Sequence, residues 1–230
     1  CEDLADHWCP VLSLREDEIA QQMRRDRIDV LIVLAAHFDD NRPLVAGLEP
    51  APVIISHHDI GTMGMGQIGY LIADRVMAPR GTGESFVERP IRMPSYVLMP
   101  APARLPEPGP PPMLSRGAPT FGSFNNPAKV TPAVQDLWSR VLAAVPGSRL
   151  ILKYRVSYFD ADLQAHIRGR FEAAGVAGDR IEFIAREESF DAHMVRYAEI
   201  DVALDTYPFS GSTTTFEALW MGVPVVTLAG

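Results

Sequence analysis

Cysteine, lysine and long apolar stretches are scarce in this 230-residue chain. The two cysteines, Cys1 and Cys9, lie together at one end, where they can neither join distant segments nor supply four ligands to a zinc ion, so we expect a reducing compartment. No apolar run approaches the roughly 20 residues that span a bilayer, and the first residues do not resemble a signal peptide. We therefore expect a cytoplasmic protein with no membrane partner.

A surplus of basic charge is also missing. Lysine and arginine together number 21 against 29 acidic residues, which gives a net charge of -8 and a pI near 5.2. Because nucleic-acid binding depends on a basic field that neutralises phosphates, this balance argues against a nucleic-acid partner. Hydrophobic residues make up 47% of the chain and charged residues 22%, as in ordinary globular proteins of one or two domains.

Helix and strand patterns alternate in the first half of the chain. Residues 16–27 predict a short surface helix, residues 28–34 a buried strand, and residues 53–55 and 70–72 two further strands. This order is typical of part of an open α/β sheet. We therefore expect a first lobe at residues 1–99.

Proline is concentrated directly after this half. Eight of the 20 prolines fall between Pro100 and Pro119, and such a density favours an extended, semi-rigid connector over packed structure. We therefore expect a connector at residues 100–118 and a second lobe at residues 119–230.

The second lobe has the more regular pattern. Thr131 and Pro132 supply an N-cap and a first helical residue, and apolar residues then recur at helical spacing until Pro146 and Gly147 end the stripe. Strict alternation of strand and helix indicates a parallel, doubly wound sheet, whose ligands bind outside the carboxyl ends of the strands. The strands are predicted at 120–124, 150–152, 181–184, 201–204 and 224–228, and the further helices at 160–174, 187–197 and 213–222.

The loop at residues 123–132 joins a strand to the start of a helix and is a candidate anion site. Unpaired N–H groups and the positive end of the helix dipole converge at such a junction. Lys129 adds a full charge, and it is one of only two lysines among the 21 basic residues. The alternative is a solvated loop lysine without a ligand.

A second junction of strand and helix spans residues 207–220. Hydroxyl side chains and backbone N–H groups crowd the predicted helix start at Ser212, Thr213 and Thr214, which suits a phosphate. Glu217 lies one turn further, where a carboxylate can accept hydrogen bonds from a ribose diol. The alternative is a capping box, in which Glu217 binds the backbone N–H of Thr214.

Two further motifs carry weaker signals. Gly64, Gly66 and Gly69 match the dinucleotide-binding fingerprint, but no strand leads directly into them, so an NAD-dependent oxidoreductase is disfavoured. Asp160 and Asp162 form an Asp-x-Asp pair of the kind that holds metals, yet Asp160 as an N-cap explains the pair without a metal.

Histidines follow the predicted strands of the first half. His37, His57 and His58 are candidates for a zinc site or a general base, but they lack the spacing of helical zinc ligands, so residues that line a cleft are favoured. His193 lies on the predicted helix at 187–197 and is either a surface residue or a member of the site.

Several segments together resemble one family. In the second lobe they are residues 121–132, 137–138, 145–150, 201–206 and 213–228. In the first lobe they are residues 28–34, His37, Asn41, Arg42, residues 50–53, Gly61 and Thr62. From about residue 15 to residue 230, the chain resembles the catalytic region of the O-GlcNAc transferase family, including its bacterial and SPINDLY-like members.

The resemblance implies a fold and an activity. The fold is of GT-B type, with two Rossmann-like lobes that carry parallel sheets, of which the amino-terminal lobe is incomplete in this chain. The activity is an inverting, metal-independent transfer of N-acetylglucosamine from UDP-N-acetylglucosamine to serine or threonine hydroxyls of proteins, without a cofactor. The family also has tetratricopeptide repeats upstream of the region matched here and further helix downstream.

Residues of the family's donor site carry over to matching positions. The resemblance implies that Lys129 contacts the pyrophosphate, that Asn126 lies near the phosphates, and that Thr213 and Thr214 bind a phosphate from their helix. Glu217 occupies the acidic position that binds the ribose.

Other matches involve histidines and departures from the family pattern. His193 matches a histidine near the uridine, and His37 matches one that faces the acceptor. Ser212 stands where the family often has histidine or glycine, and Phe190 where it commonly has a basic residue. Because these positions and the segment around His57 differ from the family pattern, the alternative function is a catalytically silent module that binds UDP-sugars.

Overall fold

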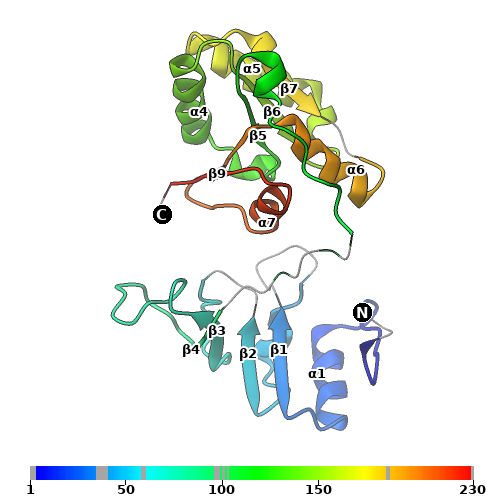
Figure 1. Ribbon diagram of the computed structural model, residues 1–230. Helices are drawn as coiled ribbons and strands as arrows, with labels where there is room; N and C mark the ends of the chain where they lie inside the picture. The colour runs from blue at the N-terminus through cyan, green and yellow to red at the C-terminus, as the bar shows by residue number, and fades with distance from the viewer. Residues whose placement is uncertain are drawn as a thin grey trace. The chain divides into compact units, whose positions relative to one another are not determined.

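The computed structural model describes residues 4–34, 41–57, 61–95, 99, 102, 104–184 and 187–228. They belong to two compact units, Cys1–Leu98 and Met99–Gly230, and each unit contains a sheet of parallel strands accompanied by helices (Figure 1). The predicted α/β class is therefore confirmed. Among the described residues, none of the helices has the length and apolar character needed to cross a bilayer.

The first unit is built on a four-stranded sheet in the order β1-β2-β3-β4. The predicted helix and three predicted strands are present, with ends that differ by a few residues. A fourth strand, β4, escaped prediction because Pro90 and two arginines make its sequence look like a loop. The elements are α1 (Glu16–Arg25), β1 (Val30–Leu34), α2 (Leu44–Gly47), β2 (Val53–His57), β3 (Tyr70–Asp74) and β4 (Arg89–Met93).

The prediction of a buried strand at 28–34 is wrong for one face of β1. Val30, Ile32 and Leu34 are 47%, 52% and 57% exposed, whereas Leu31 and Val33 pack toward the helices. Ala46 of α2 packs on the face that carries Leu31 and Val33, and β1 is also an edge strand of the described sheet. An apolar run alone does not tell how many faces of a strand are covered.

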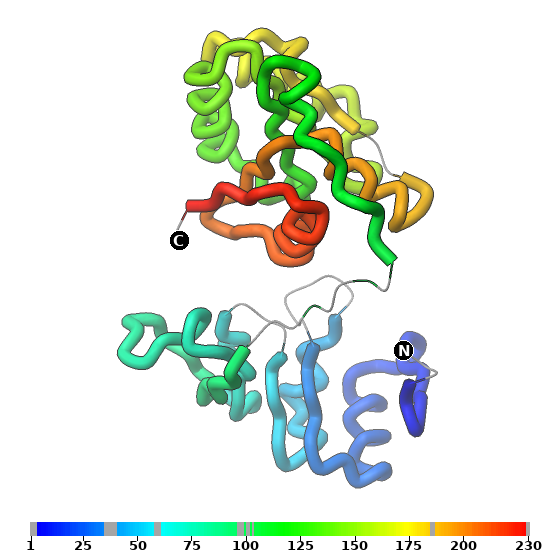
Figure 2. Tube along the Cα trace, in the orientation of Figure 1, coloured from blue at the N-terminus to red at the C-terminus, as the bar shows by residue number. Residues whose placement is uncertain are grey.

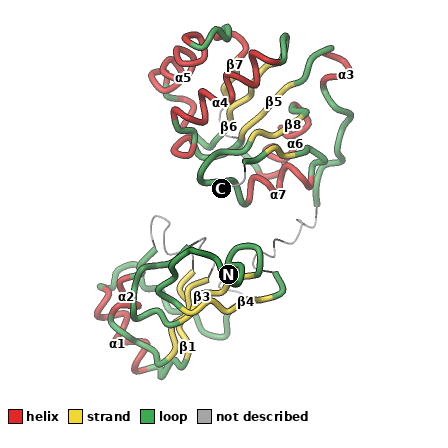
Figure 3. Tube along the Cα trace, turned by 90° about the vertical axis from the view of Figure 1, so that its left-hand side faces the viewer, coloured by secondary structure: helices red, strands yellow, loops and turns green. Residues whose placement is uncertain are grey.

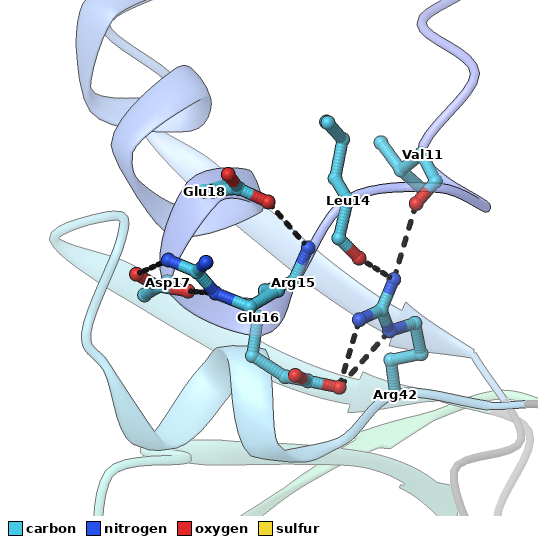
Figure 4. A network of polar contacts seen from close by, with 7 residues as sticks. All are labelled: Val11, Leu14, Arg15, Glu16, Asp17, Glu18 and Arg42. Atoms are coloured by element: carbon cyan, nitrogen blue, oxygen red, sulfur yellow. Dashed lines mark hydrogen bonds and ion pairs between the residues drawn. The ribbon is translucent and has the colours of Figure 1, made fainter.

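Arg42 joins the start of α1 to the segment before α2 (Figure 4). Its guanidinium donates to the carboxylate of Glu16, with an Nη2 to Oε1 distance of 2.9 Å, and to the backbone carbonyls of Val11 and Leu14. At the same helix start, the backbone N–H of Arg15 donates to the Glu18 carboxylate at 2.8 Å. These contacts satisfy polar groups that the helix itself leaves unpaired.

The second unit has a five-stranded sheet in the order β7-β6-β5-β8-β9, and all of its strand pairs are parallel. The predicted alternation of strands and helices is confirmed throughout this unit. Its elements are α3 (Met113–Arg116), β5 (Thr120–Ser123), α4 (Pro132–Ala144), β6 (Arg149–Lys153), α5 (Ala161–Ala173), β7 (Ile181–Ile184), α6 (Phe190–Val195), β8 (Val202–Leu204), α7 (Thr213–Trp220) and β9 (Val225–Val226).

Helices cover both faces of this second sheet (Figure 3). On one face, α4 and α5 bury Trp138 and Phe171 against strand residues such as Leu150. On the other face, α6 and α7 bury Met194 and Ala218 against Ile151. Because Leu150 and Ile151 are neighbours in β6, the two cores lie back to back across the sheet.

Local sequence signals place the helices that support the site. The Thr131 hydroxyl accepts from the backbone N–H of Val134, and Pro132 opens α4, as predicted. The Asp160 carboxylate accepts from the N–H groups of Asp162 and Leu163 at the start of α5, so the predicted cap is confirmed.

Gly122 allows β5 to pass close to Ile200, the residue that follows η5 (Arg196–Glu199). A Cβ at this glycine would lie 2.6 Å from Cγ2 of Ile200, which is too close for any side chain without a shift of the neighbour. The glycine therefore lets the chain before β8 pack directly on β5.

The predicted connector at 100–118 ends in regular structure. Figure 2 shows residues 104–112 as an extended trace along the second unit that leads to α3. Leu105 packs against the core shared by α6 and α7, and the backbone N–H of Met113 donates to Asp201 at 2.9 Å. The end of this segment is thus attached to the second unit.

Candidate functional site

The candidate site lies where the strand order of the second sheet reverses. The chain runs from β5 outward through β6 to β7, and then returns to place β8 on the other side of β5. Loops that leave β5 and β8 therefore diverge from adjacent carboxyl ends, which is the usual place for ligands in sheets of this kind. A small pocket at this point is lined by residues of both strands, among them Ser123, Asn125, Asp205 and Thr214.

Lys129 reaches from the first loop to the second. Its Nζ donates to the backbone carbonyl of Ser210 at 3.0 Å and lies 4.1 Å from the ring centre of Phe209. Burial lowers the pKa of Lys129 below its ordinary value, and the nearby Asp205 carboxylate opposes this shift. The two strand-to-helix junctions that the sequence indicated are therefore close neighbours.

Asn125 and Asp205 form the polar floor between the two loops. Oδ1 of Asp205 accepts from the backbone N–H groups of Thr206 and Gly211, at 2.8 Å and 2.7 Å. Oδ1 of the buried Asn125 accepts from the Thr214 hydroxyl at 2.9 Å. The fold thus ties the start of α7 to the end of β5.

Asn126 and Thr213 border this floor. Asn126 is partly exposed, and its Oδ1 accepts from the backbone N–H of Ala128 at 3.0 Å, which caps the 3-10 turn η2 (Pro127–Lys129). Thr213 is the first residue of α7, and Ser212 precedes it at the cap position; both are exposed. Among the described residues no side chain caps α7, so no cap occupies the N–H groups of Thr213 and Thr214 at its start.

The capping-box alternative for Thr214 and Glu217 is contradicted. Helix α7 begins at Thr213, and the Glu217 carboxylate turns to other elements instead of back to Thr214. Its Oε2 lies 3.0 Å from Nε2 of His193 and 3.0 Å from the hydroxyl of Tyr197. Glu217 is 7% exposed, so these partners offset the cost of burying its charge.

His193 is part of the site and not a surface residue. Its Nδ1 lies 2.7 Å from Nζ of Lys153, the last residue of β6, while its Nε2 faces Glu217. Phe190 lies on the exposed side of the imidazole with ring centres 6.3 Å apart, and Tyr197 meets it edge-on at 5.6 Å. An aromatic surface therefore continues outward from the histidine.

Other predicted residues have different outcomes. His37 and His58 lie outside the described residues. Gly64, Gly66 and Gly69 occupy the segment between β2 and β3, and the strand β3 follows them where the dinucleotide fingerprint requires a helix. Within the described ranges, no three histidine, cysteine, aspartate or glutamate side chains gather as a metal site would require.

Sequence reasoning missed four residues that build the site. Asn125, Lys153, Tyr197 and Asp205 supply its hydrogen bonds. Asn125 lies in the candidate loop at 123–132 and Asp205 in the family-like segment 201–206, but neither of them was given a role of its own. Lys153 alone carried a signal, because a lysine that ends an apolar strand in a chain with two lysines invites an explanation.

Comparisons with known sequences agree on one family. The model of glycosyl transferase family 41 matches residues 113–230, half of the chain. The chain is 39% identical to the probable UDP-N-acetylglucosamine–peptide N-acetylglucosaminyltransferase SPINDLY of Arabidopsis thaliana, over 97% of this chain and 24% of that protein. It is 30% identical to the probable transferase SEC of the same plant, over 97% of this chain and 23% of that protein. The chain thus spans about a quarter of the length of these relatives.

Solved structures give the same result for the fold. A mutant of the O-GlcNAc transferase of Thermobaculum terrenum matches with a TM-score of 0.91 and 38% identity, over 100% of this chain and 43% of that chain. Anabaena HepE, solved with UDP and glucose, matches at a TM-score of 0.50 and 13% identity over 96% of this chain and 64% of that chain, which concerns the fold alone. The expected GT-B fold is confirmed, and the chain belongs to glycosyl transferase family 41.

Proposed function

We propose that this chain is the donor-binding part of an inverting, metal-independent transferase that moves N-acetylglucosamine from UDP-N-acetylglucosamine to serine or threonine hydroxyls of proteins. The observation that carries the proposal is the convergence of Lys129 and the start of α7 at the carboxyl ends of β5 and β8. Lys129 bonds to Ser210, three residues before α7 begins, and Thr214 bonds to Asn125 next to the Lys129 loop. The names of the relatives support the donor and the protein acceptor.

The chemistry follows from where charge develops. When the glycosidic bond breaks, negative charge accumulates on the oxygens of the departing UDP. The Lys129 ammonium, the exposed Thr213 hydroxyl and the uncapped N–H groups of α7 provide positive potential at that point, and preorganised donors of this kind lower the barrier to reaction. We propose that they fill the role that a divalent cation has in other transferases, and that no cofactor takes part.

The remaining contacts assign parts of the donor to parts of the site. Glu217 lies one turn along α7 from the threonines proposed to bind phosphate, and it would accept from the ribose hydroxyls. His193 and the ring of Phe190 form the adjoining aromatic surface, on which a uracil ring can stack. Asn126 has its Nδ2 group available for the diphosphate, since Oδ1 caps η2.

Proton removal from the acceptor hydroxyl requires a general base. The resemblance assigns the acceptor side to His37, and a histidine is a suitable general base near neutral pH. The donor phosphate or a water chain are alternatives. We further propose that the protein acts in the cytoplasm, and that tetratricopeptide repeats of the whole protein present the acceptor.

The proposal is tested by Lys129→Ala in the full protein, with Arg140→Ala as the matched control. Arg140 is an exposed cation on α4, so its loss changes the net charge equally without touching the site. Transfer of labelled N-acetylglucosamine to a protein acceptor is expected to fall by about 100-fold to 1,000-fold in Lys129→Ala, as on loss of one group that stabilises a transition-state charge. Arg140→Ala is expected to keep the parental rate.

Two outcomes would contradict the proposal in different ways. An unchanged rate in Lys129→Ala would remove the lysine from the mechanism. If the unaltered protein binds UDP in calorimetry but forms no product, the result would support the catalytically silent module that binds UDP-sugars. That alternative is based on Phe190, which stands where the family commonly has a basic residue.

A further inference from the structure

Lys153 is a buried cation with a specific partner. It is the last residue of β6, its side chain is 4% exposed, and its Nζ lies 2.7 Å from Nδ1 of His193. Burial lowers the pKa of Lys153, the carboxylates of Glu187 and Glu217 raise it, and Arg196 lowers it further. Burying a lysine ammonium costs free energy unless hydrogen bonds and opposite charges compensate for the lost contact with water.

The contact continues through the imidazole to the carboxylate of α7. On the far side of the ring, Nε2 of His193 lies 3.0 Å from Oε2 of Glu217, and the Tyr197 hydroxyl lies 3.0 Å from the same oxygen. Lys153, His193, Tyr197 and Glu217 come from β6, α6, η5 and α7, so four separate elements meet in one chain of hydrogen bonds.

The direction of the bonds follows from the chemistry of the donors. An ammonium group carries three N–H donors and no acceptor, so the imidazole must accept from Lys153 at Nδ1. A neutral imidazole that accepts at one nitrogen carries its proton on the other. Nε2 of His193 then donates to Glu217, and the Tyr197 hydroxyl donates to the same Oε2.

We propose that Lys153 is a positioning residue that fixes His193 in the tautomer with the proton on Nε2 and thereby orients Glu217 toward the ribose of the donor. The second part of this proposal, the orientation of Glu217 (the orienting step), rests on the proposed function, whereas the first part, the tautomer of His193, does not. Both described donors to the carboxylate approach Oε2, so Oε1 is the oxygen that we expect to accept from the ribose. Hydrogen-bond partners of metal-binding histidines fix the orientation of the imidazole in the same way. Loss of such a partner weakens metal binding by about 10-fold to 100-fold.

The first test is made on the unaltered chain and needs no donor. Side-chain nitrogen NMR distinguishes a protonated from an unprotonated imidazole nitrogen, and the chain has six histidines, so His193→Gln suffices to assign the signal. We expect Nδ1 of His193 to be unprotonated and Nε2 to carry the proton at neutral pH. A proton on Nδ1 would mean that Lys153 accepts as a neutral amine, and it would overturn the inference.

The second test measures binding of two probes, UDP and 2′,3′-dideoxy-UDP, to the full chain by calorimetry. Lys153→Met keeps the length of the side chain and removes the donor, whereas Lys153→Arg keeps a donor. We expect Lys153→Met to bind UDP about 10-fold more weakly than the parent, with partial recovery in Lys153→Arg. For the dideoxy probe, which lacks the hydroxyls that Glu217 would bind, the parent and Lys153→Met are expected to differ little.

The outcomes separate this inference from the proposed function. Equal weakening of both probes by Lys153→Met would show a general structural role and overturn the orienting step. If the unaltered chain binds neither probe, the proposed function fails, and the tautomer of His193 still confirms or refutes the part of the inference that concerns Lys153. If Lys153→Met does not fold, the tautomer of the unaltered chain decides that part, and the probe comparison in Lys153→Arg decides the orienting step.

Discussion

Replacing Tyr197 with phenylalanine should destabilise the second unit and leave its shape intact. The Tyr197 side chain is 1% exposed, and its hydroxyl lies 3.0 Å from Oε2 of Glu217 and 3.3 Å from the backbone carbonyl of Thr214. The ring itself packs against Phe124 with ring centres 4.6 Å apart, and this packing survives the substitution. The change therefore removes one hydrogen bond to a buried charge and little else.

The magnitude follows from the kind of bond that is lost. A hydrogen bond to a charged group contributes about 1.5 to 3 kcal/mol, and its loss leaves Glu217 with one donor fewer in a buried place. We expect a loss of about 2 kcal/mol in the free energy of unfolding, which is roughly a 30-fold change in the unfolding equilibrium. With an ordinary urea dependence of about 2 kcal/mol per molar, the midpoint should fall by about 1 M.

Tyr158→Phe is the matched control. Tyr158 is 2% exposed in the same unit, but its hydroxyl has no hydrogen-bond partner among the described residues. Removing a buried hydroxyl without a partner should leave the free energy of unfolding unchanged or raise it slightly. Urea unfolding followed by the fluorescence of Trp138, which is 1% exposed and lies in the same unit, measures both variants. Equal effects of the two substitutions would refute the reasoning.

Three further predictions concern the same unit. Gly211→Ala should weaken UDP binding about 10-fold by calorimetry, because its Cβ would lie 2.7 Å from the Thr214 hydroxyl. Gly169→Ala, a helix position with no atom within 4 Å of the added carbon, should raise the free energy of unfolding by about 0.5 to 1 kcal/mol in urea titrations. Burial raises the pKa of Tyr158 and Tyr197 above the ordinary 10.0. In urea titrations, the free energy of unfolding should therefore not depend on these tyrosines below pH 10, and above pH 10 it should fall by about 1.4 kcal/mol per pH unit for each tyrosine.

Local signals in the sequence were sufficient for the second unit. The cap at Thr131, the proline at position 132 and the apolar stripe of α4 lie within a few residues of one another, and the structure reproduces them. The first unit was harder, because the exposure of Val30 and Ile32 depends on which faces of a sheet the rest of the chain covers. No pattern within a single strand contains that information.

The same distinction holds for the site. Lys129 and Thr214 were found because charge and hydroxyls at a helix start have a local rationale. Glu217 was ambiguous, since a capping box and a ligand carboxylate have the same spacing. The positions of His193 and Tyr197 contradict the capping box, and the contact with a ribose stays a prediction. Contacts between elements that are 20 to 40 residues apart are set by sheet order, which spacing along the chain does not reveal.

The use of lysine in this chain now has a physical explanation. Only two lysines occur among 21 basic residues. Lys129 ends the turn η2 that follows β5, and Lys153 ends β6, the strand that pairs with β5. Lys129 reaches the loop that begins α7, and Lys153 reaches Glu217 in the same helix through His193. The lysine ammonium is a compact charge on a flexible side chain, which suits a single acceptor in a narrow space. The planar guanidinium of arginine suits bidentate contacts with a carboxylate. Arginines instead form ion pairs such as Arg170 with Asp136, or donate to several backbone carbonyls at once, as Arg180 does, whereas both lysines contact residues around α7.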